Sequence, residues 1–142
     1  MVSAVTLSGA QFLGPEVSRD APSQFSACEP ASGKALEPAF AEASAREVDA
    51  AMALADAAFK TLYATSGARR AELLEAIADE IVALGDALIE RAGLETGLPA
   101  ARLTGERART VGQLKLLASY AREGSWVNAR VDRADPARQP LP

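Results

Sequence analysis

The 142-residue sequence contains no histidine and only one cysteine, Cys28. Structural zinc sites are built from cysteine and histidine, so the composition excludes a Cys/His zinc site and predicts no metal centre of that kind. A single cysteine also excludes a disulfide within the chain. Cysteine usage of this kind favours the reducing cytoplasm as the location of the protein.

An excess of basic charge and long apolar runs are also missing. The chain carries 15 Lys and Arg against 19 Asp and Glu, a net charge of −4, whereas nucleic-acid binding needs a basic face. No apolar run approaches the roughly 18 residues that span a bilayer, and residues 1–11 lack the features of a signal peptide. We therefore expect binding to neither nucleic acid nor membrane.

The composition that remains is that of a globular protein, with 49% hydrophobic and 24% charged residues. Residues 1–10 are expected to be a flexible N-terminus. Residues 11–40 alternate over the short segments 11–14, 23–28 and 35–40, with a turn at 31–34. Prolines within this region, at Pro15, Pro22, Pro30 and Pro38, oppose a long helix. The prediction for 11–40 is a set of β arms and turns.

Residues 44–123 read as four consecutive helices. The first begins at Ser44, because Ser44-Ala45-Arg46-Glu47 forms a capping box. The second follows Ser66, the third is capped by Asp86 and stops at Gly97, and the fourth runs from about residue 100 to 122. Three of these helices carry apolar stripes that we expect to be buried, formed by Val48, Ala51, Met52, Ala55, Ala58, Phe59 and Leu62; by Leu73, Leu74, Ile77, Ile81 and Leu84; and by Leu103, Val111, Leu114, Leu117, Ala118 and Ala121.

For the last segment, residues 124–142, the sequence predicts a strand over 126–131 followed by a linker. Residues 135–142 contain three prolines and lead onward as an extended segment. The fold class predicted for the whole chain is α+β and mainly α, with N-terminal β arms followed by four helices.

Catalytic chemistry finds little support in the residues themselves. There is no histidine to act as a base, and no glycine-rich phosphate loop follows a predicted strand. Cys28 is more readily interpreted as a half-buried strand cysteine than as a nucleophile. Glu90 and Glu95 lie five residues apart on a helix and do not face each other, so surface carboxylates are favoured over an acid–base pair.

The fourth predicted helix carries a polar stripe beside two glycines. Residues of the stripe recur at steps of four, three and four and share one helix face; they are Arg102, Glu106, Arg109 and Gln113. One interpretation is a solvated face with ion pairs of Glu106 to either arginine. The other is that a ligand or another element passes along the small-residue strip of Gly105, Ala108 and Gly112, where Arg109 takes a carboxylate bidentately. Composition favours the solvated face and tight helix packing.

Four sequence motifs occur together in a fixed order. They are Cys28-Glu29-Pro30-Ala31-Ser32-Gly33-Lys34, Val48-Asp49-Ala50-Ala51-Met52 through Ala57-Ala58-Phe59, Arg69-Arg70-Ala71-Glu72-Leu73-Leu74, and Glu95-Thr96-Gly97-Leu98-Pro99. In order and spacing they resemble the opening of the aldehyde dehydrogenase superfamily, although Ser32 and Leu98 stand where threonine and lysine are commoner. The resemblance extends from about Gln11 to Pro142.

The resemblance implies an α/β enzyme whose Rossmann and catalytic domains lie beyond this chain. Its activity would be NAD- or NADP-dependent oxidation of an aldehyde, by thiolate attack, hydride transfer to the nicotinamide and thioester hydrolysis. The catalytic cysteine and glutamate and the cofactor-binding residues would lie after Pro142, so none is expected here and the fragment alone should be inactive. Within the superfamily, the segments 95–99, 103–106, 109–114, 123–127 and 132–136 look most like a subgroup that oxidises 2,5-dioxopentanoate to 2-oxoglutarate, and Leu98 favours this subgroup.

In this family the fourth helix flanks the channel by which aldehyde reaches the cysteine. The resemblance therefore implies that Arg109, with Gln113 and Glu106, contacts the carboxylate or keto end of the substrate. It also implies that residues from Ala129 onward enter a strand arm through which subunits associate into a dimer or tetramer. A different class of protein, a stand-alone helical interaction module without catalysis, is the alternative.

Overall fold

The computed structural model describes residues 7–131, Arg133 and Ala137. Most of the expected flexible N-terminus and of the expected linker at 135–142 lies outside the described residues. Within them the elements are β1 (Gln11–Leu13), β2 (Glu16–Ser18), β3 (Gln24–Cys28), β4 (Ala35–Ala41), α1 (Ala45–Tyr63), α2 (Gly67–Ala83), α3 (Gly85–Thr96), α4 (Ala100–Glu123) and the short 3-10 helix η1 (Ser125–Val127). The chain is mainly helical with two small antiparallel strand pairs, as the sequence predicted.

The strands form two separate hairpins, β1 with β2 and β3 with β4. The predicted turn after Pro30 closes the second hairpin: Gly33 donates its N–H to the Glu29 carbonyl at 2.8 Å, and Glu29 donates to the Lys34 carbonyl at 2.9 Å. Phe25 and Phe40 stack across this hairpin with ring centroids 5.7 Å apart. Strand β2, which has Val17 as its single apolar residue, was not predicted.

The helix starts follow local sequence signals with one exception. At α1 the predicted capping box is present: Glu47 N–H donates to Ser44 Oγ at 3.2 Å, and Ser44 N–H donates to Glu47 Oε2 at 2.8 Å. The prediction that Asp86 caps the third helix was wrong. Leu84 is both the C-cap residue of α2 and the N-cap residue of α3, and Gly85 turns the chain with a φ of +60°. Asp86 lies in the first turn of α3 without a capping bond.

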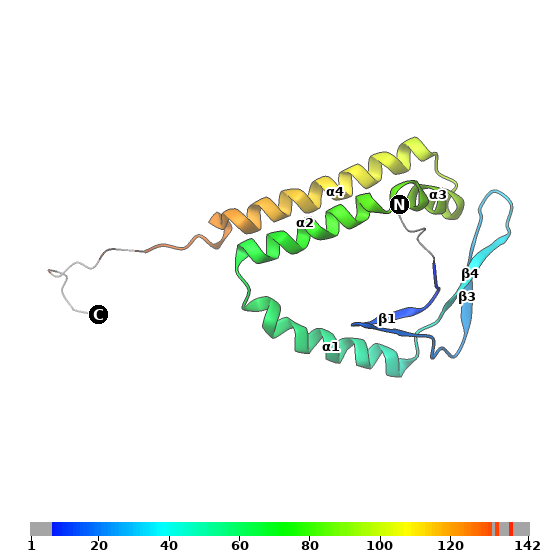
Figure 1. Ribbon diagram of the computed structural model, residues 1–142, viewed down its shortest axis with the longest axis horizontal. Helices are drawn as coiled ribbons and strands as arrows, with labels where there is room; N and C mark the ends of the chain where they lie inside the picture. The colour runs from blue at the N-terminus through cyan, green and yellow to red at the C-terminus, as the bar shows by residue number, and fades with distance from the viewer. Residues whose placement is uncertain (1–6, 132, 134–136, 138–142) are drawn as a thin grey trace.

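Helices α2 and α4 pack side by side and antiparallel, and they form the most closely packed part of the molecule (Figure 1). Ala71 and Ala78 of α2 and Ala118 of α4 are fully buried between them. Small side chains let the two backbones approach closely, and a Cβ atom on Gly67 would lie only 2.1 Å from the Ala121 carbonyl oxygen. The pair is held at its edges by ion pairs from Arg122 to Glu75 at 2.7 Å and from Lys115 to Asp79 at 3.2 Å.

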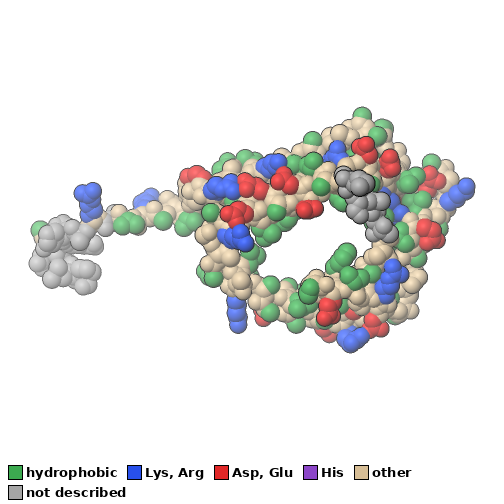
Figure 2. Space-filling model, viewed as in Figure 1, with side chains coloured by type: hydrophobic (Ala, Val, Ile, Leu, Met, Phe, Trp, Pro, Cys, Tyr) green, Lys and Arg blue, Asp and Glu red, His purple; other side chains and the backbone are tan. Residues whose placement is uncertain are grey.

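The remaining elements curve away from this pair and return, so that the chain surrounds an open space. Figure 1 shows α1 diverging from α2 at one end, while the two hairpins lead back towards α3 at the other. Figure 2 shows an opening through the molecule at the centre of this ring, with hydrophobic side chains along part of its rim. The accessible surface is 11055 Å², whereas a compact monomer of this mass exposes about 7,000 Å².

This arrangement contradicts the expectation of a buried stripe for α1, and it does so in part for α2 and α4. On α1, the exposed fractions of Val48, Met52 and Phe59 are 50%, 66% and 61%, and on α2 Leu73 is 49% exposed. Leu117 of α4 is also half exposed at 49%. The period of each stripe is helical, as predicted, but within the described residues nothing covers the α1 stripe or the Leu73 side of α2, whereas the α4 stripe lies against α2 around the fully buried Ala118. An apolar stripe indicates that a helix face is suited to burial, but it does not identify what covers that face.

The strand predicted over residues 126–131 was also wrong. Residues Ser125–Val127 form η1, and Asn128 ends it in the left-handed conformation with a φ of +50°. A strand needs a neighbour to pair its backbone groups, and among the described residues none runs beside this segment. In the part of the chain that the structure describes, no helix is both long and apolar enough to cross a membrane.

Candidate functional site

The polar stripe predicted from the sequence lies on the face of α4 that points away from α2. Ala118, Leu114 and Val111 mark the side of α4 turned towards α2. At 100° per residue, Arg109 lies roughly 180° around the helix from Ala118. The four stripe residues, Arg102, Glu106, Arg109 and Gln113, are all exposed. The structure thus places them together on one open surface.

Glu106 pairs with Arg109, which settles one alternative that the sequence left open. The Nε and Nη2 atoms of Arg109 both donate to Oε2 of Glu106, at 3.0 and 2.9 Å. The Arg109 side chain is 70% exposed and that of Glu106 is 47% exposed. Ion pairs this exposed contribute about 1 kcal/mol or less, because water screens them and side-chain entropy opposes them. The Arg109 guanidinium can therefore exchange Glu106 for another carboxylate at little cost.

The glycines beside this stripe face open space. A Cβ atom on Gly105 or Gly112 would meet no other atom within 4 Å outside its own helix. Tight packing against another described helix therefore does not explain these two glycines, contrary to the interpretation that composition favoured. Along this strip the outer face of α4 has no bulky side chain at the two glycines, and it is accessible to solvent.

The other candidates from the sequence do not form a catalytic arrangement. Cys28 is exposed at the end of β3, not half-buried as expected, and its Sγ lies 3.8 Å from the Glu29 carbonyl oxygen. Glu95 pairs with Nε of Arg91 at 2.5 Å, and Glu90 is exposed on the same helix, α3. These carboxylates act as surface and pairing groups, as predicted.

Sequence reasoning missed the role of Arg91, which joins α3 to the second hairpin. Its guanidinium lies 5.9 Å from the centre of the Phe40 ring and donates through Nη1 to the Glu37 carbonyl. The side chain is only 19% exposed. Phe40 and Glu37 both lie more than 50 residues from Arg91 in sequence, so no local pattern could have indicated these two contacts.

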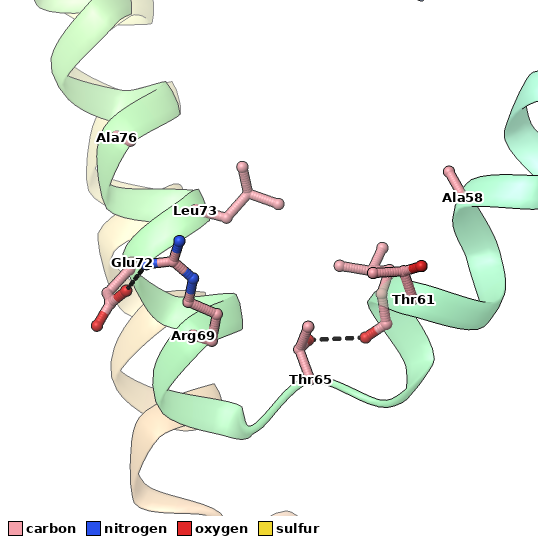
Figure 3. A pocket seen from close by; sticks show the side chains of 8 residues that line it. Ala58, Thr61, Thr65, Arg69, Glu72, Leu73 and Ala76 are labelled. Atoms are coloured by element: carbon pink, nitrogen blue, oxygen red, sulfur yellow. Dashed lines mark hydrogen bonds and ion pairs between the residues drawn. The ribbon is translucent and has the colours of Figure 1, made fainter.

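A cavity of about 720 Å³ lies in the angle between α1 and α2. Figure 3 shows Ala58 and Thr61 of α1 facing Ala76, Leu73 and Arg69 of α2 across this space. A neighbouring cavity of about 370 Å³ shares Leu62 and Leu73 and adds Phe59, Tyr63, Arg70 and Leu74 to its lining. The sequence assigned Leu62 and Leu73 to buried stripes, and it gave no sign that the two stripes would face each other across a gap.

The described residues do not fit a dinucleotide. Such a cofactor is held where a parallel strand leads through a glycine-rich loop into a helix. Here both strand pairs are antiparallel, and β4 reaches α1 through Glu42-Ala43-Ser44, which contains no glycine.

Comparison with known proteins identifies the group of enzymes to which these features belong. "Alpha-ketoglutaric semialdehyde dehydrogenase 2" of Azospirillum brasilense is 50% identical over 137 residues, covering 96% of this chain and 26% of that protein. "Alpha-ketoglutaric semialdehyde dehydrogenase" of Acinetobacter baylyi (strain ATCC 33305 / BD413 / ADP1) is 46% identical over 103 residues, covering 72% of this chain and 20% of that protein. The chain therefore spans about a quarter of the length of the curated relatives it matches.

A family model supports the same assignment. Residues 17–140, which include the β3–β4 hairpin and all four helices, match the model of the aldehyde dehydrogenase family. The match covers most of the chain and agrees with the order of motifs read from the sequence. The chain belongs to the aldehyde dehydrogenase family.

Proposed function

We propose that this chain is the N-terminal portion of an NAD(P)-dependent aldehyde dehydrogenase that oxidises α-ketoglutarate semialdehyde, 2,5-dioxopentanoate, to 2-oxoglutarate. The observation that carries the proposal is the 50% identity over 137 residues to the A. brasilense enzyme of that name. The departure at Leu98, which favoured this subgroup in the sequence, points the same way. The parent enzyme is proposed to be a homo-oligomer whose association uses residues from Ala129 onward.

Within this proposal the chain supplies scaffold and part of the substrate channel, while the reacting groups belong to the rest of the parent. The half-exposed stripes of α1 and α2 support this view, because they suit a chain that packs against further protein. The same exposure counts against a stand-alone helical module, which would have to bury its own apolar faces to be stable. The 142 residues alone are expected to be inactive.

The part of this chain proposed to touch substrate is the outer face of α4. A substrate with an aldehyde at one end and a carboxylate at the other needs a cation at a fixed distance from the reacting carbon. Arg109 is suited to this role because its planar guanidinium binds a carboxylate through two hydrogen bonds. Its partner Glu106 is exposed and easily displaced. Gln113, one turn further along, adds an amide donor for the keto oxygen.

The test is a substrate-preference measurement in the full-length parent enzyme. Arg109→Ala should raise KM for 2,5-dioxopentanoate by a factor on the order of ten to a hundred, because charge-assisted hydrogen bonds contribute about 1.5–3 kcal/mol. The kinetics for an alkyl aldehyde without a carboxylate should change little. Lys115→Ala is the matched control, since Lys115 is a cation of α4 paired with Asp79 on the side of α2.

An unchanged preference for the dicarbonyl acid in the Arg109→Ala variant would show that this helix face does not bind the carboxylate. A loss of activity towards both aldehydes would assign Arg109 a structural role instead. Activity of the parent towards alkyl aldehydes alone would reject 2,5-dioxopentanoate as the substrate.

A further inference from the structure

Arg107 lies on the inner, otherwise apolar face of α4. One helical turn before and after it on that face are Leu103 and Val111, which the sequence assigned to a buried stripe. At 100° per residue, Arg107 lies about 20° around the helix from Ala118, which is fully buried against α2. Arg107 itself is half-buried. A charge in such a place costs desolvation energy unless a polar partner compensates it.

The partner of Arg107 is a backbone carbonyl at the turn between α2 and α3. Nη1 of Arg107 donates to the Gly85 carbonyl at 2.7 Å, and Figure 1 shows this half of α4 beside α3, where α2 ends. None of the ion pairs among the described residues includes Arg107. The negative end of the α2 dipole supplies the opposing charge, as it does for cations at the C-termini of other helices.

Three cations tie α4 to its neighbours, and Arg107 is the one nearest to the polar stripe. Lys115 and Arg122 pair with carboxylates of α2 at 3.2 and 2.7 Å. These two residues lie roughly 9 and 20 Å from Arg109 along the helix axis, whereas Arg107 lies about 3 Å from it. The tie made by Arg107 therefore has the most direct influence on where the Arg109 side chain points.

The hydrogen bond of Arg107 fixes the rotation of α4 about its own axis. Leu103 also contacts α3 here, beside Gly93, but an apolar contact is non-directional, whereas a hydrogen bond has a preferred direction. Arg107 and Arg109 point to opposite sides of the helix, about 200° apart. With side chains about 6 Å from the axis, a rotation of about 10° moves the Arg109 side chain by about 1 Å. A displacement of about 1 Å can cost up to a hundredfold in rate.

We propose that Arg107 is a positioning residue for Arg109. Its hydrogen bond to the Gly85 carbonyl holds the N-terminal half of α4 in the rotation that presents the Arg109 guanidinium to the substrate carboxylate. The inference rests on the proposed function, because it takes Arg109 to bind that carboxylate. Arg107 acts from the inner face of the helix and does not contact the substrate.

The experiment measures KM and kcat of variants of the full-length parent enzyme with 2,5-dioxopentanoate and with an alkyl aldehyde. Arg107→Met keeps an unbranched apolar stem in the stripe but removes the donor. Arg107→Lys restores a donor, and a lysine can replace this arginine because only Nη1 is bonded. Arg122→Met is the matched control, since it removes an arginine that ties α4 to α2 far from Arg109.

Arg107→Met should raise KM for 2,5-dioxopentanoate by a factor on the order of three to ten, while both constants for the alkyl aldehyde change by less than about twofold. Arg107→Lys and Arg122→Met should keep the KM of the unmodified enzyme. Arg107→Gln, whose side chain is shorter than that of arginine, repeats the measurement if Arg107→Met gives no soluble enzyme.

Three results would overturn the proposal. One is an unchanged KM for 2,5-dioxopentanoate in Arg107→Met, and another is an equal rise for both aldehydes, which a general loss of structure would produce. The third is a defect in Arg107→Lys as large as that in Arg107→Met, because the hydrogen bond would then not be the cause.

A double-mutant cycle shows whether Arg107 acts through Arg109. In the Arg109→Ala background, Arg107→Met should raise KM for 2,5-dioxopentanoate by less than about twofold further, because the effects of coupled residues do not add. A full further rise would give Arg107 a separate role and overturn the proposal. Arg109→Ala without effect on the preference for the dicarbonyl acid rejects the proposed carboxylate contact and this inference with it. An effect of Arg109→Ala without an effect of Arg107→Met rejects the positioning role alone.

Discussion

At the scale of single residues, two glycines of the helical pair should respond in opposite ways to the same substitution. In Gly67→Ala the new Cβ would meet the Ala121 carbonyl oxygen at 2.1 Å, and this backbone atom cannot move unless α4 moves. We expect a loss of about 1–3 kcal/mol, the usual cost of overpacking. Gly105→Ala meets nothing within 4 Å and should stabilise α4 by up to about 1 kcal/mol. Urea unfolding followed by circular dichroism measures both, and a stable Gly67→Ala variant would contradict the close approach of the helices.

Glu47 should contribute to the acid sensitivity of the chain. It is 3% exposed, and the nearby Ser18 hydroxyl, followed by the Ser44 N–H, holds the pKa of this carboxyl below its ordinary value of 4.5. Oε1 itself has no partner at strict hydrogen-bond geometry. A carboxyl with a lowered pKa stabilises the fold above the unfolded-state pKa, and this stabilisation is lost as the pH falls from about 4.5 through the folded-state pKa.

The Glu47→Gln variant tests this assignment. Compared with the unmodified chain, its urea midpoint should be lower at pH 7, and the difference should shrink as the pH falls below about 4.5. Glu75, beside the Arg122 guanidinium, and Glu123, beside the Ser125 hydroxyl, also have lowered pKa values, so both proteins will lose stability in acid. Glu90→Gln, at an exposed position of α3, is the control. A Glu47→Gln difference that does not vary with pH would remove the carboxyl from this role.

Local contacts also decide which parts of the site were predictable. Glu47 and Ser44 are three residues apart, so the capping box indicated their contact, whereas helical spacing left Glu106 to pair with either Arg102 or Arg109. Arg91 and Phe40 are brought together only by the course of the chain. The exposure of Cys28 was missed because alternation in a short strand does not tell which face is covered.

At the scale of elements, α4 has one packed side and one open side, and a matched pair of substitutions separates them. Ala118 is fully buried against α2, whereas Ala108 is exposed on the same helix. Ala118→Leu should destabilise the chain by about 1–3 kcal/mol, because the helices cannot separate without losing the other contacts of the α2–α4 pair. Ala108→Leu should be within about 0.5 kcal/mol of the unmodified chain. Similar urea midpoints for the two variants would show that α2 and α4 do not pack as described.

Helix boundaries such as those at Ser44 and Gly97 were predictable because their signals are local. The burial of the helices was not predictable in the same way. The stripe of α1 has the period of a buried face, yet Met52 and Phe59 are largely exposed. An apolar period indicates that a helix face is suited to burial, and for α1 the described residues do not bury that face. The strand expected at 126–131 failed for a related reason, because strand formation depends on a partner and not only on side-chain alternation.

At the scale of the whole molecule, the open ring predicts how this chain should unfold. The urea m-value grows with the surface exposed on unfolding. With 11055 Å² still accessible in the folded state, the chain buries roughly a quarter to a third less surface than a compact domain of its length. We therefore expect an m-value lower by about that fraction, together with binding of an apolar fluorescent dye in buffer without denaturant. The Leu62→Ser, Leu73→Ser double variant should bind less dye, because it removes two large apolar side chains that line the cavity between α1 and α2. An m-value typical of a compact domain, with a midpoint that rises with protein concentration, would instead mean that copies of the chain cover one another's apolar faces.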